Sequence, residues 1–374
     1  MKIKRYVSVL LLIIITFTPF IAVEFGYRFY KRYVPRETGG DYRELAQLQG
    51  WTSHQINKHI DSCSTFSNMY RDYYLFSLEP KNVGDINITE YFSARSTPDS
   101  VHIGEATSII WMFGGSTMQN FETNDKLSIA NTIAIAANKK EKVAVLNFGT
   151  GSFHSITESI KFFDLLRRIN PIEYPKIAIF YDGYNDAEHS YLYGPGNLNG
   201  NWTKPISYIV KGNYDKLFAL SANIMLSEYI KVYKSIQIHL DTILKKETSS
   251  NLKYYSDPGQ SVSVYLTNRK QIEAVCNSFN VRCLFVLQPL LVTKSPLHPF
   301  EEKVLSRQMP GLVQFTRDFY SMVLANSRNN KNFVDLSQIL NNETTPHFYD
   351  FGHTGPLTGK IIGEAISASL SVSE

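Results

Sequence analysis

Three short apolar runs, each followed at once by a turn rich in glycine or polar residues, constrain the fold of this chain most. They are Ile109–Phe113, Val143–Leu146 and Ile177–Phe180. A run of four or five apolar residues without polar alternation is typical of a strand buried on both faces of a parallel sheet. The runs therefore predict a sheet whose two faces are both covered.

Helical patterns and further strands separate and follow these runs. A helix is predicted where four apolar residues recur at helical spacing before Pro171: Phe162, Leu165, Leu166 and Ile169. Two later strands are predicted at Cys283–Leu287 and Phe333–Leu336. This alternation predicts an α/β fold with a mostly parallel central sheet.

Polar motifs stand where the predicted strands end. The first three strands lead into Gly114–Thr117, Asn147–Gly149 and Gly183–Asp186, and a fourth motif, Asp350–His353, comes near the end of the chain. In an open α/β sheet, ligands bind at the carboxyl ends of the strands. We therefore expect the motifs to meet at one edge of the sheet.

The residue types in these motifs suit ester cleavage through a serine. Ser116 follows its strand through two glycines, which allow a sharp turn that leaves the hydroxyl uncovered. His353 is a candidate base, and Asp350 could bond its second ring nitrogen if the loop forms a turn. Asn185 could direct its amide at the negative charge that develops on the substrate. Each motif alone is weak, since Gly-Gly-Ser is commonly a turn and Asn or Asp commonly caps a helix.

In their order, the motifs resemble those of the SGNH (GDSL-type) hydrolases over about residues 105–370. The resemblance implies a three-layer α/β/α, flavodoxin-like fold. It also implies that Ser116, His353 and Asp350 form a catalytic triad, with the Ser116 backbone and Asn185 in the oxyanion hole and Gly183 supporting Asn185. The Glu24–Arg28 and Val286–Pro289 stretches are similar to those of membrane-anchored members.

The second motif departs from the pattern of that family. A typical member reads Asn-x-Gly-x-x-Gly, whereas this chain places Ser152 at the last position, with Gly151 before it. The slot provides a backbone N–H to the oxyanion hole, so Ser152 can serve if its backbone adopts the required conformation. Otherwise Gly151 takes the role after a small shift in register.

The first 23 residues predict a membrane anchor. Tyr6 to Val23 is apolar and uncharged, which is about the length needed to cross a bilayer, and no clear cleavage site for a signal peptidase follows. We expect a single-pass anchor with an extracytoplasmic catalytic domain, periplasmic or at the cell surface. Residues 1–36 hold seven basic side chains and one acidic one, so the net charge of +4 belongs to the anchor and does not indicate nucleic-acid binding.

Beyond the anchor, we expect a stalk and accessory segment at residues 24–104 and a catalytic domain at 105–374, with a helical insertion at about 187–258. That insertion would either shape a substrate groove or pack without ligand contacts. Cys276 and Cys283 either pair in an oxidising compartment or remain buried thiols. No metal or organic cofactor is implied.

The resemblance, taken with the predicted anchor, implies a serine esterase or O-acyltransferase that acts on a short acyl group, acetyl above all, of an extracytoplasmic carbohydrate. Hydrolysis and transfer share the first half-reaction, so the triad does not separate them. Two alternatives remain: a lipid or phospholipid esterase, and a non-catalytic protein that binds or assembles polysaccharide on the same fold. The acceptor and the oligomeric state stay open.

Overall fold

The computed structural model describes residues 40–197, 216, 218 and 254–371. The predicted membrane anchor and most of the predicted helical insertion lie outside these residues. Within them, no helix has both the length and the apolar character that a membrane crossing requires. Residues 40–197 and 254–371 belong to one compact unit, so most of the predicted accessory segment lies in the same unit as the sheet.

A five-stranded parallel sheet forms the centre of this unit, in the order β6-β5-β7-β8-β9. The strands are β5 (Ser108–Gly114), β6 (Val143–Asn147), β7 (Ile177–Asp182), β8 (Arg282–Leu287) and β9 (Phe333–Asp335). All five coincide with the predicted strands to within two residues at each end. The predicted α/β class with a parallel central sheet is confirmed.

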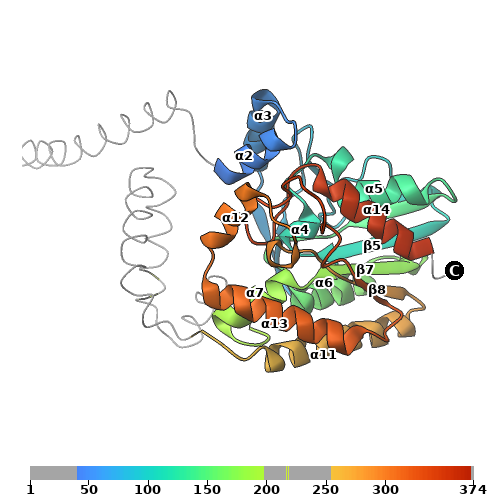
Figure 1. The fold of residues 1–374 in the computed structure, drawn as a ribbon. Coiled ribbons are helices and arrows are strands. Elements are labelled where there is room, and N and C mark those ends of the chain that lie inside the picture. The colour runs from blue at the N-terminus through green and yellow to red at the C-terminus, as the bar shows by residue number, and fades with distance from the viewer. Residues whose placement is uncertain (1–39, 198–215, 217, 219–253, 372–374) are drawn as a thin grey trace, which may run out of the picture. The chain divides into compact units, whose positions relative to one another are not determined.

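Helices cover both faces of the sheet, which gives three layers (Figure 1). One face packs against α5 (Ile129–Ala137) and α14 (Thr358–Ser371), and the other against α6 (Ser155–Arg168) and α11 (Pro258–Ser278). Side chains of β5 alternate between the layers: Trp111 and Phe113 face α6, while Met112 faces α5. Burial of both faces explains why the strand is continuously apolar in sequence.

The remaining elements surround the ends and edges of the sheet. The helices are α2 (Gly40–Leu48), α3 (Ser53–Cys63), α4 (Ser116–Gln119), α7 (Tyr184–Tyr193), α12 (Pro299–Ser306) and α13 (Pro310–Ser327). Two antiparallel hairpins are formed by β1 (Asn68–Arg71) with β2 (Leu75–Leu78) and by β3 (Lys81–Asn82) with β4 (Asn87–Ile88). Short 3-10 turns are η1 (Ile103–Glu105), η2 (Asp125–Leu127), η3 (Pro171–Glu173) and η4 (Leu291–Thr293).

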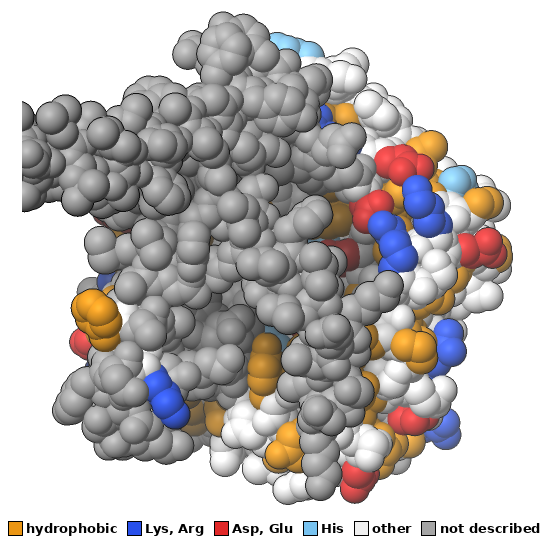
Figure 2. Space-filling model, turned by 90° about the vertical axis from the view of Figure 1, so that its left-hand side faces the viewer, with side chains coloured by type: hydrophobic (Ala, Val, Ile, Leu, Met, Phe, Trp, Pro, Cys, Tyr) orange, Lys and Arg blue, Asp and Glu red, His pale blue; other side chains and the backbone are white. Residues whose placement is uncertain are grey.

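The helix α2 packs against α12 through an apolar contact. Leu45 is fully buried in a cluster with Phe300 and Val304 of α12 and with Phe348. Exposed ion pairs flank this contact, and one joins Arg307 to Asp41 at 2.9 Å. Exposed ion pairs of this kind add little to the free energy of unfolding. On the described part of the surface in Figure 2, basic and acidic side chains are likewise interspersed.

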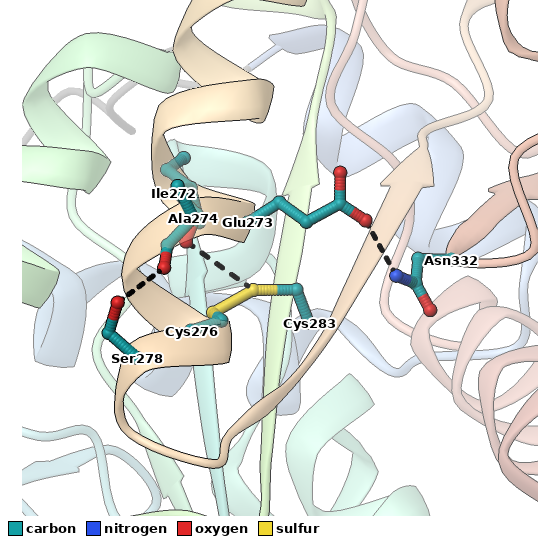
Figure 3. Close-up of a disulfide and its surroundings, with 7 residues drawn as sticks. All are labelled: Ile272, Glu273, Ala274, Cys276, Ser278, Cys283 and Asn332. Carbon is teal, nitrogen blue, oxygen red and sulfur yellow. Dashed lines mark hydrogen bonds between the residues drawn. A yellow bond between two sulfur atoms is a disulfide. The ribbon is translucent and has the colours of Figure 1, made fainter.

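Cys276 and Cys283 form a disulfide, which selects one of the two alternatives left open by the sequence. It joins the last turn of α11 to the start of β8 (Figure 3). The two cysteines are separated by only 7 residues in sequence, so closing this loop removes little entropy from the unfolded chain. The bond therefore adds only about 2 kcal/mol to the free energy of unfolding. The disulfide fixes the entry into the strand that neighbours β7.

Candidate active site

Ser116 is the first residue of α4, directly after β5. Gly115 precedes it because a side chain there would collide with the Asn185 amide and with the Phe153 carbonyl oxygen. Asn120, in the left-handed conformation, ends the helix after one turn. The hydroxyl of Ser116 is thereby held at the carboxyl end of β5.

The Asp350–His353 loop brings an imidazole to this hydroxyl. His353 Nε2 lies 2.7 Å from Ser116 Oγ, and His353 Nδ1 lies 2.7 Å from Asp350 Oδ2. The other carboxylate oxygen, Oδ1, accepts the backbone N–H groups of Gly352 at 2.9 Å and His353 at 2.7 Å. The loop thus forms the turn that the sequence required, and the three residues form one hydrogen-bonded chain.

The charge of Asp350 dominates the electrostatics of His353. Burial by itself lowers the pKa of His353, but the charge and hydrogen bond of Asp350, with smaller contributions from Glu122 and Glu188, raise it to about 9. Burial likewise raises the pKa of Asp350, and the charge of His353 outweighs this and lowers it. With Asp350 ionised, Nδ1 carries a proton. In neutral His353, Nε2 is then left to accept the Ser116 proton.

Asn185 reaches the same site from the next strand. It is the second residue of α7, which starts directly after β7, and its Nδ2 donates to the Phe153 carbonyl at 2.5 Å. Gly183, between the strand and the helix, has φ +116°, a conformation that favours glycine, and a side chain there would meet Leu287 Cδ1 at 2.7 Å. The amide therefore lies against Gly115, the residue before Ser116.

The loop after β6 carries both candidate donors of the second motif, Gly151 and Ser152. Thr150 N–H donates to the Gly114 carbonyl at 2.9 Å, which anchors the loop beside the turn that leads to Ser116. Ser152 has φ +63°, in the left-handed region. Its backbone N–H forms no hydrogen bond with another described residue, and neither does that of Gly151. The N–H of Ser116, at the first position of its helix, has no partner within α4.

Replacing Ser152 by glycine is expected to keep activity within about threefold. It should also leave the free energy of unfolding unchanged or raise it by up to about 1 kcal/mol, because glycine adopts positive φ without strain. Ester turnover and thermal unfolding measure the two effects. Asn280→Gly, at a second left-handed position with φ +55°, is the matched control for stability. A tenfold or larger loss of activity in Ser152→Gly would mean that the hydroxyl, and not the backbone, is what the site uses.

Two buried charged residues near the site, Lys161 and Glu122, were not predicted from the sequence. Lys161 of α6 donates from Nζ to the Phe148 carbonyl at 2.7 Å and to Thr150 Oγ1 at 2.8 Å, which holds the loop that carries Ser152. Burial lowers the pKa of Lys161 to about 7, and Arg71 acts in the same direction. The signal in the sequence was a lysine directly before Phe162, on the apolar side of a predicted helix. The second residue, Glu122, lies in a polar loop whose sequence gives no such sign.

Comparisons with known sequences and solved structures do not identify the reaction of this chain. No family model and no curated protein sequence matches this chain. Solved structures similar to it include a lipolytic protein of the G-D-S-L family from Desulfitobacterium hafniense, with 12% identity over 70% of this chain and 99% of the other, at a TM-score of 0.37. They also include a GDSL-like lipase from Bacteroides thetaiotaomicron, with 8% identity over 71% and 89% of the two chains, also at 0.37.

A third similar structure is the acetylxylan esterase Axe2 from Geobacillus stearothermophilus, with 8% identity over 71% of this chain and 94% of the other and a TM-score of 0.37. Likenesses of this size do not decide which reaction this chain performs. A proposal for the reaction therefore rests on the hydrogen-bonded chain of Ser116, His353 and Asp350.

Proposed function

We propose that this protein is a serine esterase or O-acyltransferase in which Ser116, His353 and Asp350 act as a triad. The observation that supports this is the continuous chain from Ser116 Oγ through both ring nitrogens of His353 to Asp350, with 2.7 Å at each step. A serine, a base and a carboxylate in this geometry are the recurrent arrangement for nucleophilic acyl transfer.

In the first half-reaction, Ser116 Oγ attacks the acyl carbonyl carbon while His353 Nε2 takes the hydroxyl proton. The carbonyl oxygen becomes an oxyanion, for which the Asn185 amide and the N–H groups of Ser116 and Ser152 are the candidate donors. The bond from carbon to the alcohol oxygen then breaks, and His353 returns the proton to that oxygen. The products are a free alcohol and an acyl group on Ser116.

In the second half-reaction, His353 takes a proton from an acceptor hydroxyl, and the acceptor oxygen attacks the acyl carbon. Water as acceptor gives a carboxylic acid, whereas a sugar hydroxyl gives a new ester. In both cases His353 returns its proton to Ser116 Oγ, so the triad serves either outcome. Which acceptor takes the acyl group depends on how well the site excludes water and orients an alcohol.

As substrate we propose a short acyl ester, acetyl in particular, on a carbohydrate outside the cytoplasm. The predicted anchor at residues 1–23 supports the location. The disulfide between Cys276 and Cys283 also supports it, because such bonds persist in oxidising compartments. The catalytic domain would then act on material at the periplasmic side or at the cell surface.

A covalent probe combined with a series of esters tests this function. We expect a fluorophosphonate to modify the full-length chain once, on the Ser116 peptide, with loss of fluoride, as mass spectrometry would show. Turnover should be highest for p-nitrophenyl acetate and fall for the butyrate and octanoate. A folded chain that takes no label would remove the serine mechanism, whereas rates that rise with chain length would favour the lipid esterase. Adding a sugar alcohol during turnover shows whether the acyl group goes to water or to a hydroxyl.

A further inference from the structure

A second carboxylate lies beside the imidazole of the candidate site. Glu122 Oε1 is 3.9 Å from His353 Nε2, the same nitrogen that lies 2.7 Å from Ser116 Oγ. The other ring nitrogen, Nδ1, is hydrogen-bonded to Asp350 Oδ2. His353 is therefore faced by one carboxylate at each nitrogen. Mechanisms built on Ser116, His353 and Asp350 leave Glu122 without a role.

The loop that carries Glu122 is fixed by a buried arginine. Arg95 is 2% exposed, and its guanidinium donates to the carbonyl oxygens of Gln119 and Thr123, each at 2.7 Å, and to that of Asn120. It also pairs with the Asp125 carboxylate at 2.9 Å. The loop is thus held on both sides of Glu122, so the distance to His353 is built into the fold.

The side chain and backbone of Glu122 have their own contacts. Oε2 accepts from Asn120 Nδ2 at 3.2 Å, and the backbone carbonyl accepts from the Tyr42 hydroxyl of α2 at 2.9 Å. Glu122 is 6% exposed, and within the described residues its ion pair is with His353 alone. With Oε2 engaged by Asn120, Oε1 faces the imidazole.

The titratable and charged groups around the pair come from several elements. Those that act on His353 are Asp350, Glu122 and Glu188, and the rings of Tyr184 and Tyr349 flank it. Those near Glu122 are His353, Asp350, Tyr42, Cys63, Tyr181 and Tyr349, with Arg95 beneath its loop. Burial raises the pKa of Glu122, and the attraction of His353 opposes that rise.

We propose that Glu122 is a positioning residue for His353, an inference that rests on the proposed function. Its carboxylate stabilises the imidazolium that forms when Ser116 loses its proton, and it keeps His353 protonated in the resting site up to a higher pH. Glu122 thereby raises the pH above which the enzyme works.

The direction of the effect follows from the charge. A negative charge beside an imidazole favours the protonated form, so Glu122 raises the pKa of His353, whereas the attack by Ser116 requires the unprotonated form. Activity therefore rises with pH through the pKa of His353. Removing the charge should lower that pKa by about one to three pH units for a charge at about 4 Å.

The test compares Glu122→Gln with the unaltered full-length chain in two measurements. The first is the pH dependence of kcat/KM for p-nitrophenyl acetate, whose rising limb should move to lower pH by at least one unit. The second is an NMR titration of the His353 imidazole, with the signal assigned by its loss in His353→Asn. The same shift is expected there, and this measurement does not need catalysis. Glu122→Asp keeps a charge slightly farther from the ring and should restore part of the shift.

Glu273→Gln is the matched control. Glu273 accepts from Asn332 Nδ2 at 2.7 Å near the disulfide (Figure 3), and the glutamine carbonyl can keep that bond. We expect neither measurement to move in this variant. Should Glu122→Gln fail to fold, Glu122→Met provides a second neutral side chain of similar length for the same titration.

The outcomes separate the two proposals. A shifted titration in a chain without esterase activity would support the coupling of Glu122 to His353 and remove the proposed function. An active enzyme in which His353 titrates at the same pH in both Glu122→Gln and the unaltered chain would overturn the role of Glu122 and leave the proposed function intact.

Discussion

Replacing Ser116 by alanine is expected to lower kcat for p-nitrophenyl acetate by roughly 10⁵- to 10⁶-fold in the full-length chain. The substitution removes the only atom that the proposed mechanism joins to the acyl group. The oxyanion donors and the binding of the ester remain, and these alone retain a small rate above that of water. We expect KM to change little, since the hydroxyl acts mainly in the transition state.

Ser306→Ala is the control for this variant, because the Ser306 hydroxyl lies on the exposed part of α12 and, among the described residues, bonds only the Lys303 carbonyl, at 2.9 Å. Its turnover should equal that of the unaltered chain. Thermal unfolding of both variants shows whether the fold is intact. If the unaltered chain is folded yet no faster than Ser116→Ala, the plain esterase is ruled out, and a strictly acceptor-dependent transferase or a binding protein replaces it.

Arg95→Met should give the largest loss of stability among single substitutions near the site, about 3–5 kcal/mol. The side chain is 1% exposed and its partner Asp125 is 4% exposed, so the substitution leaves a buried carboxylate without its cation. The carbonyl oxygens of Gln119, Asn120 and Thr123 lose their donors as well. Differential scanning calorimetry should show an unfolding midpoint lower by roughly 10 °C.

Arg307→Met is the comparison for a surface charge. Its ion pair with Asp41 is 2.9 Å long, but both side chains are substantially exposed, at 47% and 34%. Exposed pairs contribute about 0–1 kcal/mol, so the midpoint should fall by far less than in Arg95→Met. Equal midpoints for the two variants would show that Arg95 does not hold the loop. Because that loop carries Glu122, Arg95→Met should also alter the pH profile of any protein that remains folded.

The strands were predictable because each needs only local information. Every residue of β5 from Ser108 to Gly114 is buried, which explains the unbroken apolar run from Ile109 to Phe113. The helix α6 was predictable for a similar reason, since one of its faces is buried against the sheet. The order of the strands was not predictable, because β5 lies between β6 and β7 through pairings that leave no trace in the local pattern.

The candidate site was predictable only as a set of residues. Ser116, Asn185, Asp350 and His353 stand in recognisable motifs, and the place of Ser116 and Asn185 after strands indicated a common edge. The role of residues 40–104 was less visible. Tyr42 of α2 reaches the Glu122 carbonyl and Arg95 binds the loop behind Ser116, so part of the predicted accessory segment supports the site directly.

What the sequence by itself determined is therefore the α/β class, the positions of the strands and the residues able to perform acyl chemistry, because periodicity and residue type are local properties. The tertiary structure decided that Ser116 and His353, 237 residues apart, lie 2.7 Å from each other. It also decided the left-handed conformation of Ser152, the disulfide, and the position of Glu122 at the imidazole. These depend on distances between distant segments, which are fixed only when the core packs and buries their charges together.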